Sequence, residues 1–130
     1  MKLYTLKNHG SEEKHARVLA LDNGTLILFS YEDPVAIAKQ QKNYYGLKQV
    51  KIFYLNRGSN KISNTTYRHI NIFINQIFIE WNNRNMNDGD VTCPVNRATL
   101  LEVINRQFKY RTVTKNSKEI SLNYKRALEE

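Results

Sequence analysis

Residues 63–74, SNTTYRHINIFI, predict the start of a helix on which the rest of the fold depends. After Ile70, apolar residues recur at intervals of three and four, which places them on one face of an α-helix: Phe73, Ile74, Ile77, Phe78 and Trp81. Polar residues fall on the opposite side: Arg68, Asn71, Asn75 and Asn82. The oxygens of Ser63, Asn64 or Thr65 can accept hydrogen bonds from the first amide groups, which have no partner within the helix. The stretch therefore predicts a capped amphipathic helix.

Before this helix, the chain alternates between β-rich runs and turns. Residues 16–21 and 25–31 flank Asn23-Gly24, which supplies the positive φ angles of a tight turn, so they predict a hairpin. Pro34 ends this run because proline cannot donate a hydrogen bond to a sheet. Further strands are expected at residues 35–39 and 48–55, separated by the polar turn QQKNYYG.

After the helix, the polar stretch NNRNMNDGD predicts a loop, and residues 96–108 predict a second helix. The tail from residue 109 has both strand-like and helix-like spacing. We expect a strand at residues 109–114 and a terminal helix after Ser117. The expected fold class is α+β, with residues 1–130 forming a single domain. It contains a mostly antiparallel sheet with two or three helices packed on one face.

His69 lies in the first turns of the predicted helix and is the strongest candidate for a catalytic residue. A catalytic histidine needs a nucleophile or an orienting carboxylate within hydrogen-bond reach. Residues 34–79 contain no Asp or Glu, so no local carboxylate is available. We therefore expect His69 to bond a backbone or threonine oxygen and to fix how the helix meets the sheet.

Other chemistry-bearing motifs are also missing from the sequence. His9 and His15 have no spacing that brings them together on a metal, and NNRNMNDGD does not follow the calcium-loop pattern. Cys93 is the single cysteine, which excludes an intramolecular disulfide. No phosphate loop or nucleophile elbow is present. We expect no enzyme activity, no cofactor and no metal.

The charge of the chain points to a polyanionic partner. Twenty Lys and Arg residues against twelve Asp and Glu residues give a net charge of +8. Basic residues are interleaved with tyrosines, as in surfaces that bind nucleic acid. The alternative is a solvated face with tyrosines at the sheet edge. The predicted nucleic-acid-binding residues are Lys39, Lys42, Tyr44, Tyr45, Lys48, Lys51, Arg57, Arg68, Lys109 and Arg111.

The N-terminal sequence MKLYTLKNHGSEEKH has no apolar run like that of a signal peptide, and no stretch approaches the length of a membrane span. The expected location is therefore the cytoplasm, with no membrane partner.

Two motifs lie in the first two thirds of the chain. FSYEDPVAI, residues 29–37, contains the pattern Ser-Tyr-Glu-x-x-Val-Ala, formed by Ser30, Tyr31, Glu32, Val35 and Ala36. ISNTTYRHIN, residues 62–71, contains Ser-x-Thr-Thr-x-x-His-Ile-Asn, formed by Ser63, Thr65, Thr66, His69, Ile70 and Asn71. Together they resemble a small uncharacterised domain family found mainly in bacteriophages.

The resemblance covers roughly residues 15–80, and the C-terminal third of the chain has no match in it. The chain departs from the family at Ile62, where an aromatic residue is usual, and in the longer insert QQKNYYGLKQ. The resemblance implies a phage or mobile-element origin, with expression in the host cytoplasm. It carries over no catalytic residue, because the family has no assigned function, and it fits a structural role for the helix start.

These observations favour a small, non-enzymatic, phage-type protein that binds DNA, RNA or a nucleic-acid-containing host complex. The alternative is a counter-defence inhibitor, similar to an anti-CRISPR protein, that binds a host protein. An inhibitor that mimics nucleic acid should be acidic, whereas this chain is basic. An enzyme such as a small nuclease is disfavoured because no carboxylate is expected near His69.

Overall fold

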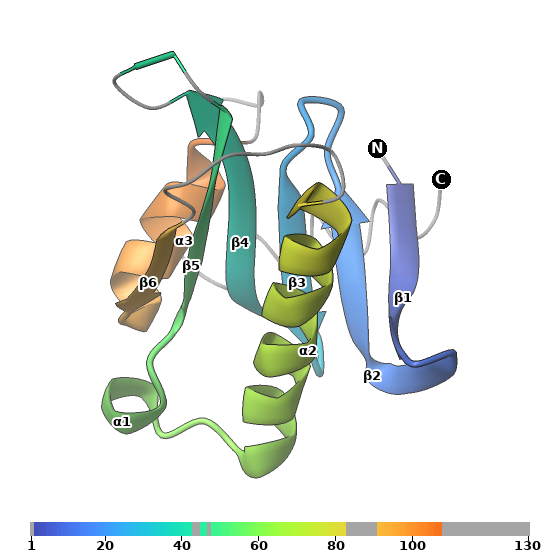
Figure 1. Cartoon of the computed structure of the whole chain (residues 1–130). Helices are drawn as coiled ribbons and strands as arrows, with labels where there is room; N and C mark the ends of the chain where they lie inside the picture. Colours follow the sequence, from blue (N-terminus) through green and yellow to red (C-terminus); the bar gives the residue numbers. More distant parts are fainter. Residues whose placement is uncertain (1, 43–44, 47, 83–90, 108–130) are drawn as a thin grey trace.

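In the part of the chain that the structure describes, six strands form one sheet, and their order across the sheet follows their order along the chain (Figure 1). The structure is a computed structural model that describes residues 2–42, 45–46, 48–82 and 91–107. The strands are β1 Lys2–Asn8, β2 Ser11–Ala20, β3 Leu26–Ser30, β4 Asp33–Lys42, β5 Lys48–Leu55 and β6 Val91–Val95. The helices are α1 Arg57–Asn60, α2 Asn64–Asn82 and α3 Arg97–Asn105.

Strands β1 to β5 pair antiparallel, whereas β6 pairs parallel to β5. Antiparallel neighbours need only a short turn, but a parallel pair needs a crossover. The connection from β5 to β6 contains α1 and α2 and supplies this crossover. The predicted α+β fold with a mostly antiparallel sheet is therefore confirmed.

Most of the predicted elements are present. The hairpin at residues 16–21 and 25–31 corresponds to β2 and β3, the strand at 35–39 lies within β4, and β5 has the predicted bounds 48–55. The two predicted helices correspond to α2 and α3. Three elements were not predicted: β1, β6 and α1. The predicted loop NNRNMNDGD covers residues 82–90, of which only Asn82, the last residue of α2, is described. The strand and helix predicted after residue 108 also lie outside the described residues.

The helices do not share one face of the sheet, so that part of the prediction is wrong. The side chain of Ser30 in β3 bonds to His69 of α2, which places Ser30 on the α2 face. Side chains alternate along a strand, so Leu26 lies on the same face as Ser30. Leu26 pairs with Ala38 of β4, and cross-strand partners share a face, so the next residue, Lys39, lies on the opposite face. There Lys39 lies within electrostatic reach of Arg106, the residue that ends α3.

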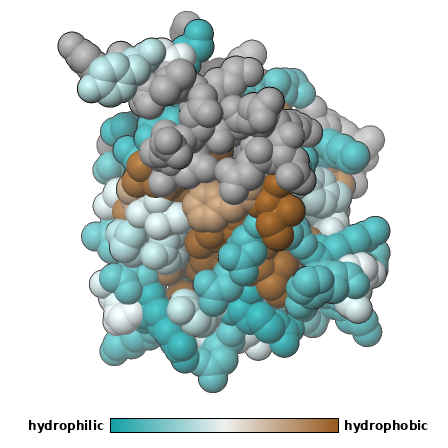
Figure 2. Space-filling model, in the orientation of Figure 1, coloured by the Kyte–Doolittle hydropathy of each residue, from teal (hydrophilic) through white to brown (hydrophobic). Residues whose placement is uncertain are grey.

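Both faces of the sheet therefore bury apolar side chains. Val18 and Leu28 lie on the α2 face, and Leu19, Ile27 and Phe29 lie on the other, all at most 1% exposed. On the α2 side, the molecular surface shows hydrophobic residues in the middle and hydrophilic residues below and on both sides (Figure 2). The core thus lies in two layers, one on each face of the sheet.

Candidate functional site

A network of side-chain hydrogen bonds joins the end of β3 to the first turns of α2. Ser30 Oγ lies 3.0 Å from Thr66 Oγ1 and 2.8 Å from His69 Nδ1. Ser63 is the cap of α2: its Oγ accepts a 3.1 Å bond from the backbone N–H of Thr66 and donates to Thr66 Oγ1 at 3.1 Å. Ser30, Thr66 and His69 are all buried. We call Ser30, Thr66 and His69 the buried polar network.

One direction of donation gives each of the three side-chain hydrogen bonds a donor and an acceptor. Ser63 donates to Thr66, Thr66 can then donate to Ser30, and Ser30 can donate to the Nδ1 lone pair of His69. This arrangement requires neutral His69 with its proton on Nε2. Buried polar groups are stabilising only when their hydrogen bonds are made, so a complete chain fixes how α2 sits on the sheet. The prediction for His69 was wrong in its partner: Nδ1 bonds to the hydroxyl oxygen of Ser30 in β3, and not to a backbone or threonine oxygen.

His69 also has a carboxylate nearby, contrary to the sequence analysis. Its Nε2 lies 3.7 Å from Oε2 of Glu13, a residue of β2 that is far from His69 in the sequence. The same Oε2 accepts a 2.8 Å bond from Arg68, whose guanidinium is largely exposed. The separation of 3.7 Å is too long for a hydrogen bond. Glu13 is therefore positioned to compensate a charge on His69, while its hydrogen bond goes to Arg68.

An aromatic stack lies beside the network. The rings of His15 and Tyr31 are stacked, with centroids 4.6 Å apart and planes 19° apart, and the Tyr31 ring is 6.1 Å from that of His69. Tyr31 and Glu32 join β3 to β4 with φ angles of 51° and 71°. A two-residue hairpin turn that matches the strand twist needs positive φ at both positions. The turn thereby holds the Tyr31 ring beside His69.

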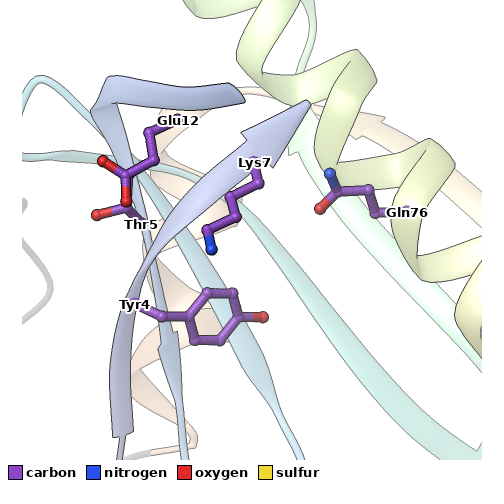
Figure 3. Close-up of a pocket in the computed structure, with 5 residues that line it drawn as sticks. All are labelled: Tyr4, Thr5, Lys7, Glu12 and Gln76. Atoms are coloured by element: carbon purple, nitrogen blue, oxygen red, sulfur yellow. The ribbon is translucent and has the colours of Figure 1, made fainter. Parts of the chain in front are cut away.

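Ser30, His69 and Glu13 have the residue types of a catalytic triad, but their geometry does not suit one. A nucleophilic serine must reach its substrate, whereas Ser30 is only 2% exposed and its oxygen contacts both Thr66 and His69. A cavity of about 430 Å³ opens elsewhere, between β1 and α2, and includes no member of the network (Figure 3). Its lining residues are Tyr4, Thr5, Lys7, Glu12 and Gln76.

The stability of the protein is expected to fall as the pH drops from about 7 to about 5, because His69 ordinarily titrates near 6.5. Burial lowers the pKa of His69, and Arg68 and His15 lower it further, while Glu13 opposes them. In this range the unfolded chain binds more protons than the folded one, so the contribution of neutral His69 is complete above about pH 6.5 and is lost below it. Unfolding free energies measured across this range should depend less on pH in His69→Asn. Parallel curves for the two proteins would contradict the prediction.

The predicted basic residues divide into separate groups. Lys39 and Lys51 are direct cross-strand partners on β4 and β5, both half-buried. Burial lowers the pKa of Lys39, and the positive charges of Arg106 and Lys51 lower it further. We call Lys39, Lys51 and Arg106 the basic cluster. The Lys51 ammonium also lies 5.1 Å from the ring centroid of Phe53.

The remaining predicted residues are not part of this cluster. Lys42 and Lys48 are register partners at the end of the β4–β5 hairpin, and Tyr45 is 82% exposed in its turn. At the other end of the sheet, Arg57 stacks on Tyr67 and donates to Asn64, and Arg68 pairs with Glu13. Tyr44, Lys109 and Arg111 lie outside the described residues.

The predicted nucleic-acid-binding residues did not include two residues of this surface, Arg106 and Phe53. The signal for Phe53 was present, because the alternation in β5 places Lys51, Phe53 and Leu55 on one side. Arg106 gave no such signal, since only the packing of α3 brings it near Lys39.

Within the described ranges, no group of three or more His, Cys, Asp and Glu side chains could hold a metal ion. No helix of that part of the chain is long and apolar enough to cross a membrane.

These features define an α+β protein in which a buried Ser-Thr-His network ties α2 to one face of the sheet. The opposite face of the sheet carries the basic cluster. The chain belongs to a family of unknown function (DUF8033), whose family model matches residues 1–90. The match includes β1 to β5 and α2, and therefore the whole buried polar network. The comparisons with curated proteins and with solved structures found no match.

Proposed function

We propose that this protein is a small, non-enzymatic, phage-type binding protein whose basic cluster contacts DNA or RNA, either free or within a host nucleoprotein complex. The phage origin rests on the two sequence motifs. The absence of catalysis is supported by the burial of Ser30 and His69, which leaves neither group accessible to a substrate. The preference for a polyanion is supported by the net charge of +8.

The placement of Lys39 opposite Lys51 is the observation that carries this proposal. Like charges directly opposite each other across two strands destabilise a sheet. Arg106 adds a third positive charge within electrostatic reach of Lys39 and further disfavours the charged form of Lys39. A phosphate bound among the three cations would remove this repulsion and raise the pKa of Lys39. A chain of phosphates is the ligand that this charge distribution suits best.

We expect the double variant Lys39→Gln, Lys51→Gln to bind labelled oligonucleotides more weakly than the native protein. Loss of two phosphate contacts should reduce the slope of log affinity against log salt by about 1.5, since each contact contributes about 0.7–0.9. The loss should be similar for all sequences, because phosphate contacts carry no base information. Fluorescence anisotropy at several salt concentrations measures both quantities.

The matched control is Lys7→Gln, Lys14→Gln, which removes the same charge from exposed positions on β1 and β2. An equal loss in the two double variants would show that net charge, and not the basic cluster, attracts the oligonucleotide. Failure of the native protein to bind DNA or RNA at low salt would refute the proposal. The host-protein inhibitor would then be the function to test, by capture of partners from nuclease-treated host extract.

A further inference from the structure

We infer that the basic cluster binds single-stranded nucleic acid and that one base stacks on the ring of Phe53. This inference rests on the proposed function and adds to it the strandedness of the ligand and an aromatic contact residue.

Phe53 lies beside the basic cluster and on the same face of the sheet. It is two residues from Lys51 on β5, so the two side chains point the same way. The Lys51 ammonium sits 5.1 Å from the ring centroid, which shows that a cation can approach the ring. The ring is half-buried and packs against the core, so it is held in place while part of it meets solvent.

The side chains of β6 that lie next to Phe53 and Lys51 are short. The register partner of Phe53 on β6 is Cys93, a short side chain, and β6 is the last strand of the sheet among the described residues. The partner of Lys51 on the same strand is Val91, which is also small. A flat group as large as a nucleobase therefore meets little steric obstruction from β6.

This arrangement favours single strands over duplexes. In a duplex the faces of the bases are covered by their neighbours in the stack, and only their edges and the phosphates are accessible. An unpaired base offers its face to an aromatic side chain while cations follow the backbone. The Lys51 ammonium would then exchange its contact with the Phe53 ring for one with a phosphate, beside Lys39 and Arg106.

The test uses a labelled oligothymidine, which forms no structure of its own, and a duplex of equal length. We expect the single strand to bind at least several-fold more tightly than the duplex. Phe53→Leu keeps an apolar side chain against the core and should weaken oligothymidine binding on the order of tenfold, the usual size of a base–aromatic contact. The salt slope should stay unchanged, because no phosphate contact is removed.

Tyr54→Leu is the matched control, since Tyr54 is the next aromatic residue on β5 and lies on the other face, opposite Ala36. Its affinity for oligothymidine should equal that of the native protein. Thermal unfolding of both variants establishes that each is folded before the titrations are compared.

Cys93 provides a second measurement that needs no variant. It is the single cysteine of the chain, and the register places it next to Phe53. Saturating oligothymidine should slow its alkylation by a maleimide several-fold, whereas the same concentration of duplex should slow it less.

Two results would overturn the inference while leaving the proposed function intact. One is equal affinity for the single strand and the duplex. The other is unchanged affinity in folded Phe53→Leu together with unprotected Cys93, while the lysine variant still lowers the salt slope. Absence of any nucleic-acid binding would instead overturn the proposed function, and this inference with it.

Discussion

Replacing His69 with alanine is expected to lower the free energy of unfolding by about 2–4 kcal/mol, because the change leaves a cavity and removes one hydrogen bond of a buried hydroxyl. The His69 ring is only 1% exposed, and its Nδ1 lies 2.8 Å from Ser30 Oγ. Without the ring, Ser30 keeps Thr66 as its one partner in the buried polar network. Urea denaturation at constant pH measures the effect, with the m-value as a check that only stability has changed.

Two further variants separate the hydrogen bond from the nearby ion pair. His69→Asn places an amide close to the position of Nδ1 and should recover part of the lost stability. Arg68→Ala removes only a largely exposed partner of Glu13 and should cost less than about 1 kcal/mol. If His69→Ala had native stability but lost a measurable activity, the structural role of the network would be wrong and His69 would belong to an active site.

The helix α2 and the strands β2 to β5 could be predicted because local sequence determines them. The apolar face from Ile70 onward has helical spacing, and Ser63 is a good cap residue. The turn at Asn23-Gly24 is likewise specified by residue type, with Gly24 at a φ of 86°. Each of these features depends on residues that lie close together in the sequence.

The edge strands could not be predicted for a physical reason. In β1 the pairing with β2 shifts between Thr5 and Lys7, so strict alternation of apolar and polar residues is interrupted. β6 contains Pro94, which weakens any strand prediction and is tolerated because β6 lies at the edge of the sheet. An edge strand buries less apolar surface, and its sequence carries a correspondingly weaker pattern.

The candidate site was only partly predictable, because its residues meet through tertiary packing. The carboxylate near His69 comes from Glu13 on β2, outside the acid-free stretch that led us to expect none. A count of basic residues likewise could not separate Arg68, which pairs with Glu13, from Lys39, which faces Lys51. Charge and composition led us to propose a polyanionic ligand, whereas the register of the sheet decides which cations lie together.

Phe29→Ala tests whether the core lies on both faces of the sheet, and should lower the free energy of unfolding by about 3–5 kcal/mol. Phe29 alternates with Ser30 along β3, so its ring points away from α2, and it is only 1% exposed. If helices covered one face alone, this ring would meet solvent and its loss would cost little. Tyr45→Ala, at an aromatic residue that is 82% exposed, is the control and should change stability by less than about 0.5 kcal/mol. A cost below about 1 kcal/mol for Phe29→Ala would contradict the two-layered core, since no fully buried phenylalanine is removed so cheaply from a packed interior.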